Sequence, residues 1–391
     1  MAIPGWLPLA ARAAGRGAGA RGPRGDRYRH RGRADPRSKS GLSLATRRDR
    51  VRVPAGRRHR AVVERARRAP RLRPGGSSGR PRGPARDHRT ACGFCGGLGE
   101  IKAIKRVSAV LIVLAILAWV LLPVARAYSL VSAQHSEPSV PAGLSVADVT
   151  FESTDGTPIR AWLALAKVGA PAIVLVHGFK TSRAEMVPWA RFLHDAGYNA
   201  LLLDLRGAGR SGGATIGLGA TEPRDIVAAV QTAGEVFRTD HVAVLGISLG
   251  AGAAILAAAL DPRIAAVVAD SAWTDQDFQL ARLGVIDVGP FRLPVPPLGV
   301  PAVNAMVGVD VTKARPLDAI SRISPRPILL IHSADDDNAT TPLDGARRLF
   351  AAAGEPKDLW VAPRGGHVGA INAFPDEYRA RVLAFLRDAL R

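Results

Sequence analysis

HVAVLGISLGAGAAILAAAL, residues 241–260, carries the most specific structural signal in the chain. Its first part is apolar and β-branched, which favours a buried strand, and its last part is an Ala/Leu/Ile run of high helix propensity. GISLG, residues 246–250, stands at the junction and has the form G-x-S-x-G. Glycine at 246 and 250 lets backbone segments approach more closely than a Cβ allows. The stretch predicts a strand, a sharp turn that presents Ser248, and a helix whose positive end lies behind the serine.

The pattern around this stretch is typical of strands that alternate with helices. The middle apolar runs are unbroken, as expected of parallel strands covered on both faces. Helical spacing of apolar residues occurs at 226–237 and at 378–389. The fold class is therefore α/β, with a doubly wound, mostly parallel sheet of eight strands. The predicted strands are residues 146–151, 159–166, 172–177, 200–204, 242–246, 265–270, 328–332 and 359–362.

The positive charge is concentrated in the first quarter of the chain. The 391 residues carry a formal net charge of +21. Residues 1–106 hold 29 Lys and Arg against six Asp and Glu, whereas the rest holds 25 basic and 27 acidic residues. Residues 1–99 are rich in Arg, Gly, Pro and Ala without apolar periodicity, so we expect a disordered basic tail.

The tail has two other interpretations. It could be an arginine-rich arm, but no aromatic platform or folded module accompanies the charge, so we do not expect nucleic acid as a partner. Alternatively, a translation start assigned too early in a GC-rich gene would give this composition. A true start at Leu98 or Val107 would leave only a short basic segment at the amino end. Cys92 and Cys95 form a lone C-x-x-C, and without a second ligand pair they predict neither a zinc nor a redox site.

Residues 107–125 form an uncharged apolar run, long enough at the lower limit to cross a membrane. Three basic residues between 102 and 106 precede the run and only Arg126 closely follows it, so the positive-inside rule places the rest of the chain outside the cytoplasm. Trp119 suits the outer interface. A cleaved signal peptide is the alternative, because residues 125–127 have the A-x-A form. The length of the run favours a retained single-pass anchor.

The remaining chain divides into a linker and one folded domain. Residues 126–143 are rich in Ser, Pro and Ala and predict a flexible linker. Residues 144–391 have the length of a single α/β domain. Within it, an apolar insertion rich in Pro and Gly, at about 274–318, is expected to form a lid.

Several stretches resemble the α/β-hydrolase family, in that family's own order. Residues 246–250 resemble its nucleophile elbow, which makes Ser248 the implied nucleophile. The run IVLVHGF ends at Phe179 and resembles the family's HG element. The resemblance implies an oxyanion hole made of the backbone N–H groups of Phe179 and Leu249.

The triad acid is implied by PILLIHSADDD, residues 327–337, which resembles the family's acid-bearing segment. Asp336 falls four residues after His332, as the family pattern requires, and is the preferred acid. Ser333 replaces the usual glycine, and the run of three aspartates leaves Asp335 as the second choice. Asp270 is a further rival, because it closes another strand at the same edge of the sheet.

The implied base is His367, in the glycine-rich segment PRGGH. A serine hydroxyl is a poor nucleophile at neutral pH, so a neutral imidazole must take its proton. A buried carboxylate then fixes the tautomer of that imidazole. We expect the remaining candidates to be framework residues; they are Asp204 and Arg206, in a segment resembling D-x-R-G-x-G-x-S, and His177 and His332 at strand ends.

The resemblance implies a serine hydrolase that cleaves a carboxylic ester through an acyl-enzyme. The lid composition suggests an apolar pocket for a small acyl or ester substrate. A serine peptidase, a thioesterase and a non-catalytic binding protein are the alternatives, because fold analogy does not separate them. The sequence contains no phosphate-binding loop and no metal-ligand cluster, so we expect no cofactor and no metal.

Overall fold

The computed structural model describes residues 95–391, with side chains from Glu100 onward. The expectations for the tail and its C-x-x-C pair therefore lie outside the described side chains. Among the described residues the dominant feature is an eight-stranded sheet.

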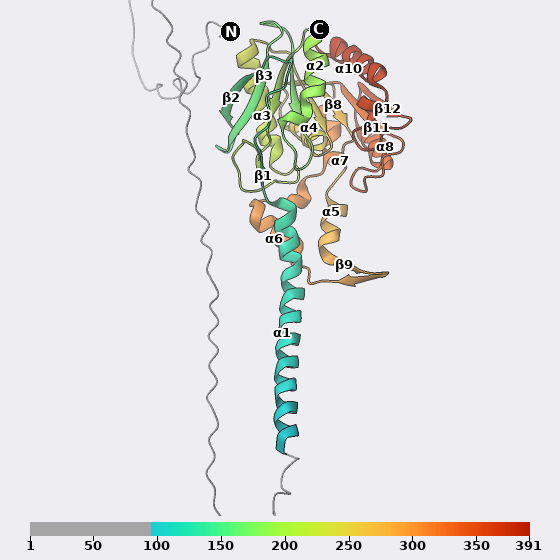
Figure 1. The fold of residues 1–391 in the computed structure, drawn as a ribbon. Helices are drawn as coiled ribbons and strands as arrows, with labels where there is room; N and C mark the ends of the chain where they lie inside the picture. Colours follow the sequence, from blue (N-terminus) through green and yellow to red (C-terminus); the bar gives the residue numbers. More distant parts are fainter. Residues whose placement is uncertain (1–94) are drawn as a thin grey trace, which may run out of the picture. The chain divides into compact units, whose positions relative to one another are not determined.

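The sheet is mostly parallel, as predicted (Figure 1). The six strands from β12 to β5 run parallel, whereas β3 pairs antiparallel with β5 and β2 pairs antiparallel with β3. Every residue of β4, β5 and β7 is buried, which explains their unbroken apolar sequences. In spatial order the strands are β12 (Lys357–Ala362), β11 (Ile328–Ser333), β8 (Ile264–Asp270), β7 (Val242–Ile247), β4 (Ala172–Val176), β5 (Asn199–Leu203), β3 (Pro158–Ala164) and β2 (Ala147–Glu152).

Helices cover both faces of the sheet. Successive strand residues point to opposite faces, so Val174 belongs to one apolar cluster with side chains of α3, α4 and α8, whereas Leu175 belongs to another with side chains of α2 and α10. The helices are α1 (Cys95–Val131), α2 (Val187–Asp195), α3 (Glu222–Phe237), α4 (Leu249–Leu260), α5 (Asp277–Ala281), α6 (Gly299–Val307), α7 (Pro316–Ala319), α8 (Leu343–Ala352), α9 (Ala370–Ala373) and α10 (Pro375–Ala389). Short 3-10 helices are η2 (Arg183–Met186), η3 (Arg282–Gly284), η4 (Val311–Lys313) and η5 (Ile320–Ile323).

Two small sheets lie outside the main one. The strand β1 (Gln134–His135) pairs with β6 (Ala208–Gly209), and β9 (Val285–Val288) forms a hairpin with β10 (Phe291–Pro294). The hairpin, α5 and α6 belong to the insertion between β8 and β11, where the lid is expected. We use "lid" for residues 274–318.

α1 is longer than the apolar run expected at 107–125. It continues past Arg126 to Val131, and both Ala127 and Val131 are buried in an apolar cluster with side chains of the lid. The β1 pairing follows directly. The first part of residues 126–143 is therefore ordered and packed, which differs from the flexible linker expected there. The physical reason is that burial against the lid stabilises one more turn and a half of helix.

α1 is also long and apolar enough to cross a membrane, by length and composition. Only 6 % of its apolar window is buried against the rest of the described chain. A helix of this kind serves equally as an anchor or as a signal sequence.

Candidate active site

Ser248 lies between β7 and α4 on a backbone turn that few residues adopt. Its φ is 50° and its ψ is −116°, and such strain persists only where the surroundings enforce it. A Cβ added at Gly246 would lie 2.3 Å from the carbonyl oxygen of Gly250, and one added at Gly250 would lie 2.5 Å from that of Val176. The strand and the helix therefore pack closely enough to require glycine on both sides of the serine.

Three side chains from separate loops meet at the carboxyl edge of the sheet. Ser248 Oγ lies 2.9 Å from His367 Nε2, and His367 Nδ1 lies 3.0 Å from Asp336 Oδ2. Asp336 follows β11 and His367 follows β12, so parallel strands deliver both to the edge that carries Ser248. The Asp336 side chain is fully buried, whereas the His367 side chain is 26 % exposed. A hydroxyl, an imidazole and a buried carboxylate in this order form the arrangement that activates a serine.

The surroundings of Asp336 keep its carboxylate ionised. Oδ1 accepts the Asn338 N–H at 2.9 Å, and Thr341 Oγ1 lies 3.4 Å from Oδ2. Burial alone would raise the pKa of Asp336, but hydrogen bonds from His367 and the Asn338 N–H hold this pKa below its ordinary value. An ionised carboxylate accepts the Nδ1–H of His367 and so leaves Nε2 free to accept the Ser248 proton.

The two rival carboxylates bind other groups. Asp335 is exposed, and its Oδ1 accepts the Gly366 N–H at 2.8 Å. Asp270 is fully buried, and its two oxygens accept hydroxyl hydrogen bonds from Ser271 and Tyr378, both at 3.0 Å. Burial raises the pKa of Asp270 to about 6. The geometry favours Asp336 as the partner of the histidine.

Phe179 and Leu249 lie beside the serine. Both line a cavity of about 130 Å³ that Ser248 also lines. Leu249 is the first residue of α4, so its N–H belongs to the helix-end donors without a partner inside the helix. The Gly178 N–H donates to Glu185 Oε2 at 2.9 Å, which fixes the loop before Phe179. The oxyanion hole stays a prediction from the resemblance.

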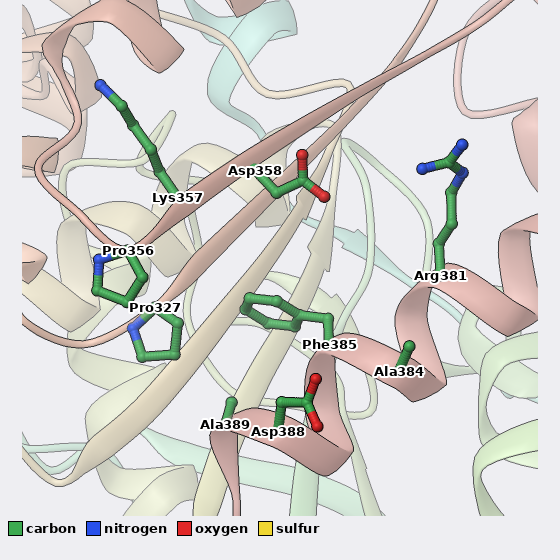
Figure 2. Close-up of a pocket in the computed structure, with 9 residues that line it drawn as sticks. All are labelled: Pro327, Pro356, Lys357, Asp358, Arg381, Ala384, Phe385, Asp388 and Ala389. Carbon is green, nitrogen blue, oxygen red and sulfur yellow. The ribbon is translucent and has the colours of Figure 1, made fainter.

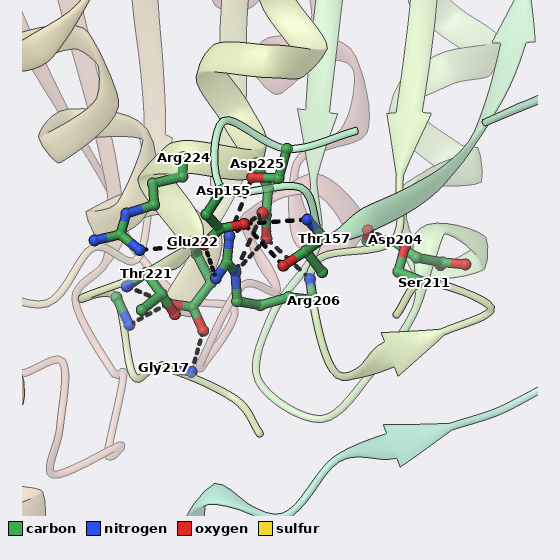
Figure 3. A network of polar contacts seen from close by, with 12 residues as sticks. Asp155, Thr157, Asp204, Arg206, Ser211, Gly217, Thr221, Glu222, Arg224 and Asp225 are labelled. Carbon is green, nitrogen blue, oxygen red and sulfur yellow. Dashed lines mark hydrogen bonds and ion pairs between the residues drawn. The ribbon is translucent and has the colours of Figure 1, made fainter. Parts of the chain in front are cut away.

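Arg206 and His177, two of the expected framework residues, are buried and hydrogen-bonded. The Arg206 guanidinium forms ion pairs with Asp225 and Asp155, each at 2.7 Å, and ties the loop after β5 to α3 (Figure 3). The Leu205 N–H donates to His177 Nε2 at 3.0 Å. Burial lowers the pKa of His177, which keeps its ring neutral. Both groups hold the strand ends around the site.

The cavity also contains polar side chains that the sequence reasoning missed. Gln276 of the lid donates to the Leu218 carbonyl at 2.8 Å, and Thr341 Oγ1 lies 3.1 Å from His367 Nδ1. Six of the ten lining residues are therefore polar, whereas the lid composition suggested an apolar pocket. The lining residues are Phe179, Leu218, Ser248, Leu249, Trp273, Gln276, Gln279, Asn338, Thr340 and Thr341.

A larger cleft, of about 600 Å³, lies on another part of the domain. Pro327, Lys357 and Phe385 are among its lining residues (Figure 2). Pro327 directly precedes β11 and Lys357 begins β12, so this cleft lies at the amino ends of the strands. It is at the opposite edge from Ser248, and ligands of open α/β sheets bind at the carboxyl edge.

Comparison with known proteins gives the same classification. A family model described as serine aminopeptidase, S33, matches residues 170–288. An uncharacterised Bacillus subtilis protein, YqkD, is 31% identical over 224 residues, which are 55% of this chain and 70% of that protein. The chain belongs to the α/β-hydrolase family. The family expected from the sequence is thereby confirmed.

A further curated protein and a solved structure are also similar to this hydrolase. A polyketide transferase of Stachybotrys chlorohalonatus is 26% identical over 302 residues, covering 62% of this chain and 97% of that protein. The structure of a Pyrococcus furiosus esterase aligns with a TM-score of 0.54 and 24% identity, covering 68% of this chain and 99% of that chain. The structural likeness supports the fold.

Proposed function

We propose that this hydrolase cleaves a carboxylic ester through an acyl-enzyme. Ser248 is the nucleophile, His367 the general base and acid, and Asp336 the carboxylate that orients it. The N–H groups of Phe179 and Leu249 form the oxyanion hole. The observation that supports the proposal most is the chain of hydrogen bonds from Ser248 Oγ through the imidazole to the buried carboxylate.

The geometry gives each group one task. Ser248 Oγ attacks the ester carbonyl carbon while its proton passes to His367 Nε2, and the carbonyl oxygen becomes an anion between the two N–H donors. His367 then gives the proton to the departing alcohol oxygen. A water molecule repeats the sequence on the acyl-enzyme and releases the carboxylic acid. Each oxyanion donor contributes about 3 to 4 kcal/mol in serine hydrolases of known mechanism.

The cavity beside Ser248 favours an ester over a peptide with a free amino terminus. Its lining residues are all uncharged. An aminopeptidase holds the charged ammonium group of its substrate, and burial of that charge without a carboxylate is costly. The cavity of about 130 Å³ is also smaller than the roughly 300–1,000 Å³ of pockets that enclose drug-sized ligands, so it suits a small acyl group.

Replacement of Ser248 tests the enzyme assignment. Ser248→Ala removes the nucleophile and little packing, so we expect loss of labelling by a fluorophosphonate probe, loss of ester hydrolysis, and an unchanged melting temperature. All three are measured on the purified full chain in detergent. Retention of more than about a hundredth of the wild-type rate contradicts the assignment, because loss of a triad member costs orders of magnitude more.

A substrate panel separates the reaction classes. Acetate and butyrate esters of p-nitrophenol, the matching thioesters, and aminoacyl p-nitroanilides present the same chromophore or a similar carbonyl. We expect the highest kcat/KM on the short oxygen esters. A preference for the anilides would favour the peptidase alternative.

We also propose that α1 is retained as a single-pass membrane anchor with the hydrolase domain outside the cytoplasm. Ala127, the last residue of the A-x-A segment, is 0% exposed and packs in the cluster shared with the lid. A signal peptidase needs an extended, accessible chain at its cleavage site, and this segment is helical and packed. The packing supports the anchor over the cleaved signal.

A further inference from the structure

The hairpin β9–β10 of the lid has two chemically different faces. Leu293 pairs with Ile286, and Phe291 pairs with Val288. Because side chains alternate along a strand, these four apolar residues share one face. Asp287 and Arg292 pair on the other face and form an ion pair at 3.3 Å. We call the first set the apolar hairpin face.

The apolar hairpin face is largely uncovered. Val288 is 51% exposed, Phe291 68% and Leu293 45%. A two-stranded hairpin is marginally stable in water by itself, and an exposed apolar patch on a folded protein usually marks a binding surface. The face therefore needs an apolar partner.

The hairpin is attached to α1 at the outer end of its apolar run. Trp119 Nε1 donates to the Pro294 carbonyl at 3.3 Å, and the Arg126 guanidinium donates to the Val285 carbonyl. Tryptophan and arginine at the end of an apolar helix mark the membrane–water interface. Figure 1 shows β9 at the end of the domain from which α1 emerges, with the strand projecting sideways from the helix. The bilayer that α1 would cross is therefore the apolar phase nearest to the hairpin.

Three cationic side chains line a hollow next to the hairpin. Arg126, Lys180 and Arg282 line this hollow, which has a volume of about 320 Å³. Lys180 Nζ donates to the Ser129 carbonyl at 2.5 Å, an uncharged partner that leaves its positive charge available to anionic headgroups. Gln279 lines both this hollow and the cavity beside Ser248. The two hollows therefore lie next to each other, with Gln279 at their boundary.

We propose that the apolar hairpin face docks into the outer leaflet of the membrane crossed by α1, and that Ser248 receives an ester carried by a bilayer-resident amphiphile. The small acyl group enters the cavity of about 130 Å³, and the lipophilic alcohol stays in the leaflet. Water completes the reaction and yields a carboxylic acid and the lipophilic alcohol. The substrate class rests on the proposed ester hydrolysis, whereas the docking rests on the hairpin and on its attachment to α1 as the proposed anchor.

Docking is tested without reference to activity. The full chain, with Cys92→Ser and Cys95→Ser, carries Phe291→Cys labelled with the fluorophore NBD and is reconstituted in phosphatidylcholine/phosphatidylglycerol vesicles. We expect quenching by lipids that bear a doxyl group near the headgroup, and protection from aqueous iodide. Leu260→Cys is the matched control, because Leu260 is 68% exposed at the far end of α4 and its label should stay in water. Equal iodide quenching of both labels overturns the docking.

The substrate class is tested with two acetate esters that share one acyl group. Hexadecyl acetate resides in the vesicle and p-nitrophenyl acetate dissolves in water. In Phe291→Asp/Leu293→Asp we expect hydrolysis of the vesicle ester to fall about tenfold or more, because two apolar side chains that would enter the leaflet are replaced by charged ones. Hydrolysis of the soluble ester should be unchanged. Leu260→Asp should affect neither ester.

The outcomes separate the two proposals. Equal rates of the variant and the wild type on hexadecyl acetate, or equal losses on both esters, overturn the bilayer-borne substrate. A wild-type chain that hydrolyses neither ester overturns the proposed function instead, and the NBD measurement still decides the docking.

Discussion

The carboxylates around His367 differ in what they bind, and substitution distinguishes them. Asp336→Asn removes the charge that orients the imidazole, so kcat should fall by about ten-thousand-fold. Asp335→Asn should retain most of the activity, because Asp335 only accepts the Gly366 N–H. Steady-state hydrolysis of p-nitrophenyl acetate by the two variants, side by side, provides the measurement. A crippled Asp335→Asn with an active Asp336→Asn would reverse the assignment.

Asp270 should instead govern stability. Its pKa in the folded chain is about 6, above the ordinary 3.8, because burial disfavours the charge. A raised carboxyl pKa means that the unfolded chain releases the proton first, so this contribution to stability is present below about pH 4 and is lost by about pH 6. The loss is on the order of 3 kcal/mol.

Asp270→Asn is the variant that reveals this effect. The melting temperature of the wild type, relative to that of Asp270→Asn, should fall between about pH 4 and pH 6.5, since the amide does not titrate. Thermal unfolding of both proteins in the same detergent across this range gives the difference. A difference that is independent of pH would mean that Asp270 keeps an ordinary pKa.

Motifs and their order along the chain were enough to nominate the candidate triad. Ser248, Asp336 and His367 occur in the order of the resembled family, and each stands after an apolar strand. The choice between Asp335 and Asp336 needed geometry, because adjacent residues differ in direction and only one turns toward the imidazole. Gln276 and Thr341 reach the cavity through loop paths that no periodic pattern encodes.

At the scale of elements, the packing of β7 against α4 predicts a sharp response to one methyl group. Gly246→Ala places a Cβ within 2.3 Å of the Gly250 carbonyl oxygen, so the turn that presents Ser248 must shift. We expect a lower melting temperature and a fall in kcat of about a hundredfold, as small misplacements at reacting atoms produce. Gly284→Ala is the control, because nothing lies within 4 Å of a Cβ there. A fully active Gly246→Ala would show that the turn tolerates the shift.

The elements differ in how far the sequence predicted them. The central strands β4, β5 and β7 were predicted because continuous apolar runs bounded by turns are typical of parallel strands covered on both faces. The end of α1 was not, because residues after Arg126 have no strong local preference and are held by contacts with the lid. The extra helical turn depends on Ala127 and Val131, whose burial arises from residues distant in sequence, in the lid and at Leu218.

At the scale of the whole molecule, the lid contacts α1 on one side and lines the cavity beside Ser248 on the other. Apolar side chains of α1 and of the lid share one cluster, and the lid also supplies Gln276 and Gln279 to the cavity beside Ser248. Cleavage within α1 would remove part of this cluster. Anchor retention and a well-formed cavity are therefore linked.

The charges at the two ends of α1's apolar run predict the location of the native protein. Lys102, Lys105 and Arg106 outweigh Arg126 at the two ends of the apolar run, so the positive-inside rule places the hydrolase domain outside. We expect the full chain in the membrane fraction, accessible to protease added to spheroplasts, with an export-dependent reporter fused after Arg391 active. Protection from that protease would reverse the orientation. Recovery from the medium of a chain that begins near Tyr128 would show instead that residues 125–127 are cleaved; the packing of Ala127 against the lid argues for retention.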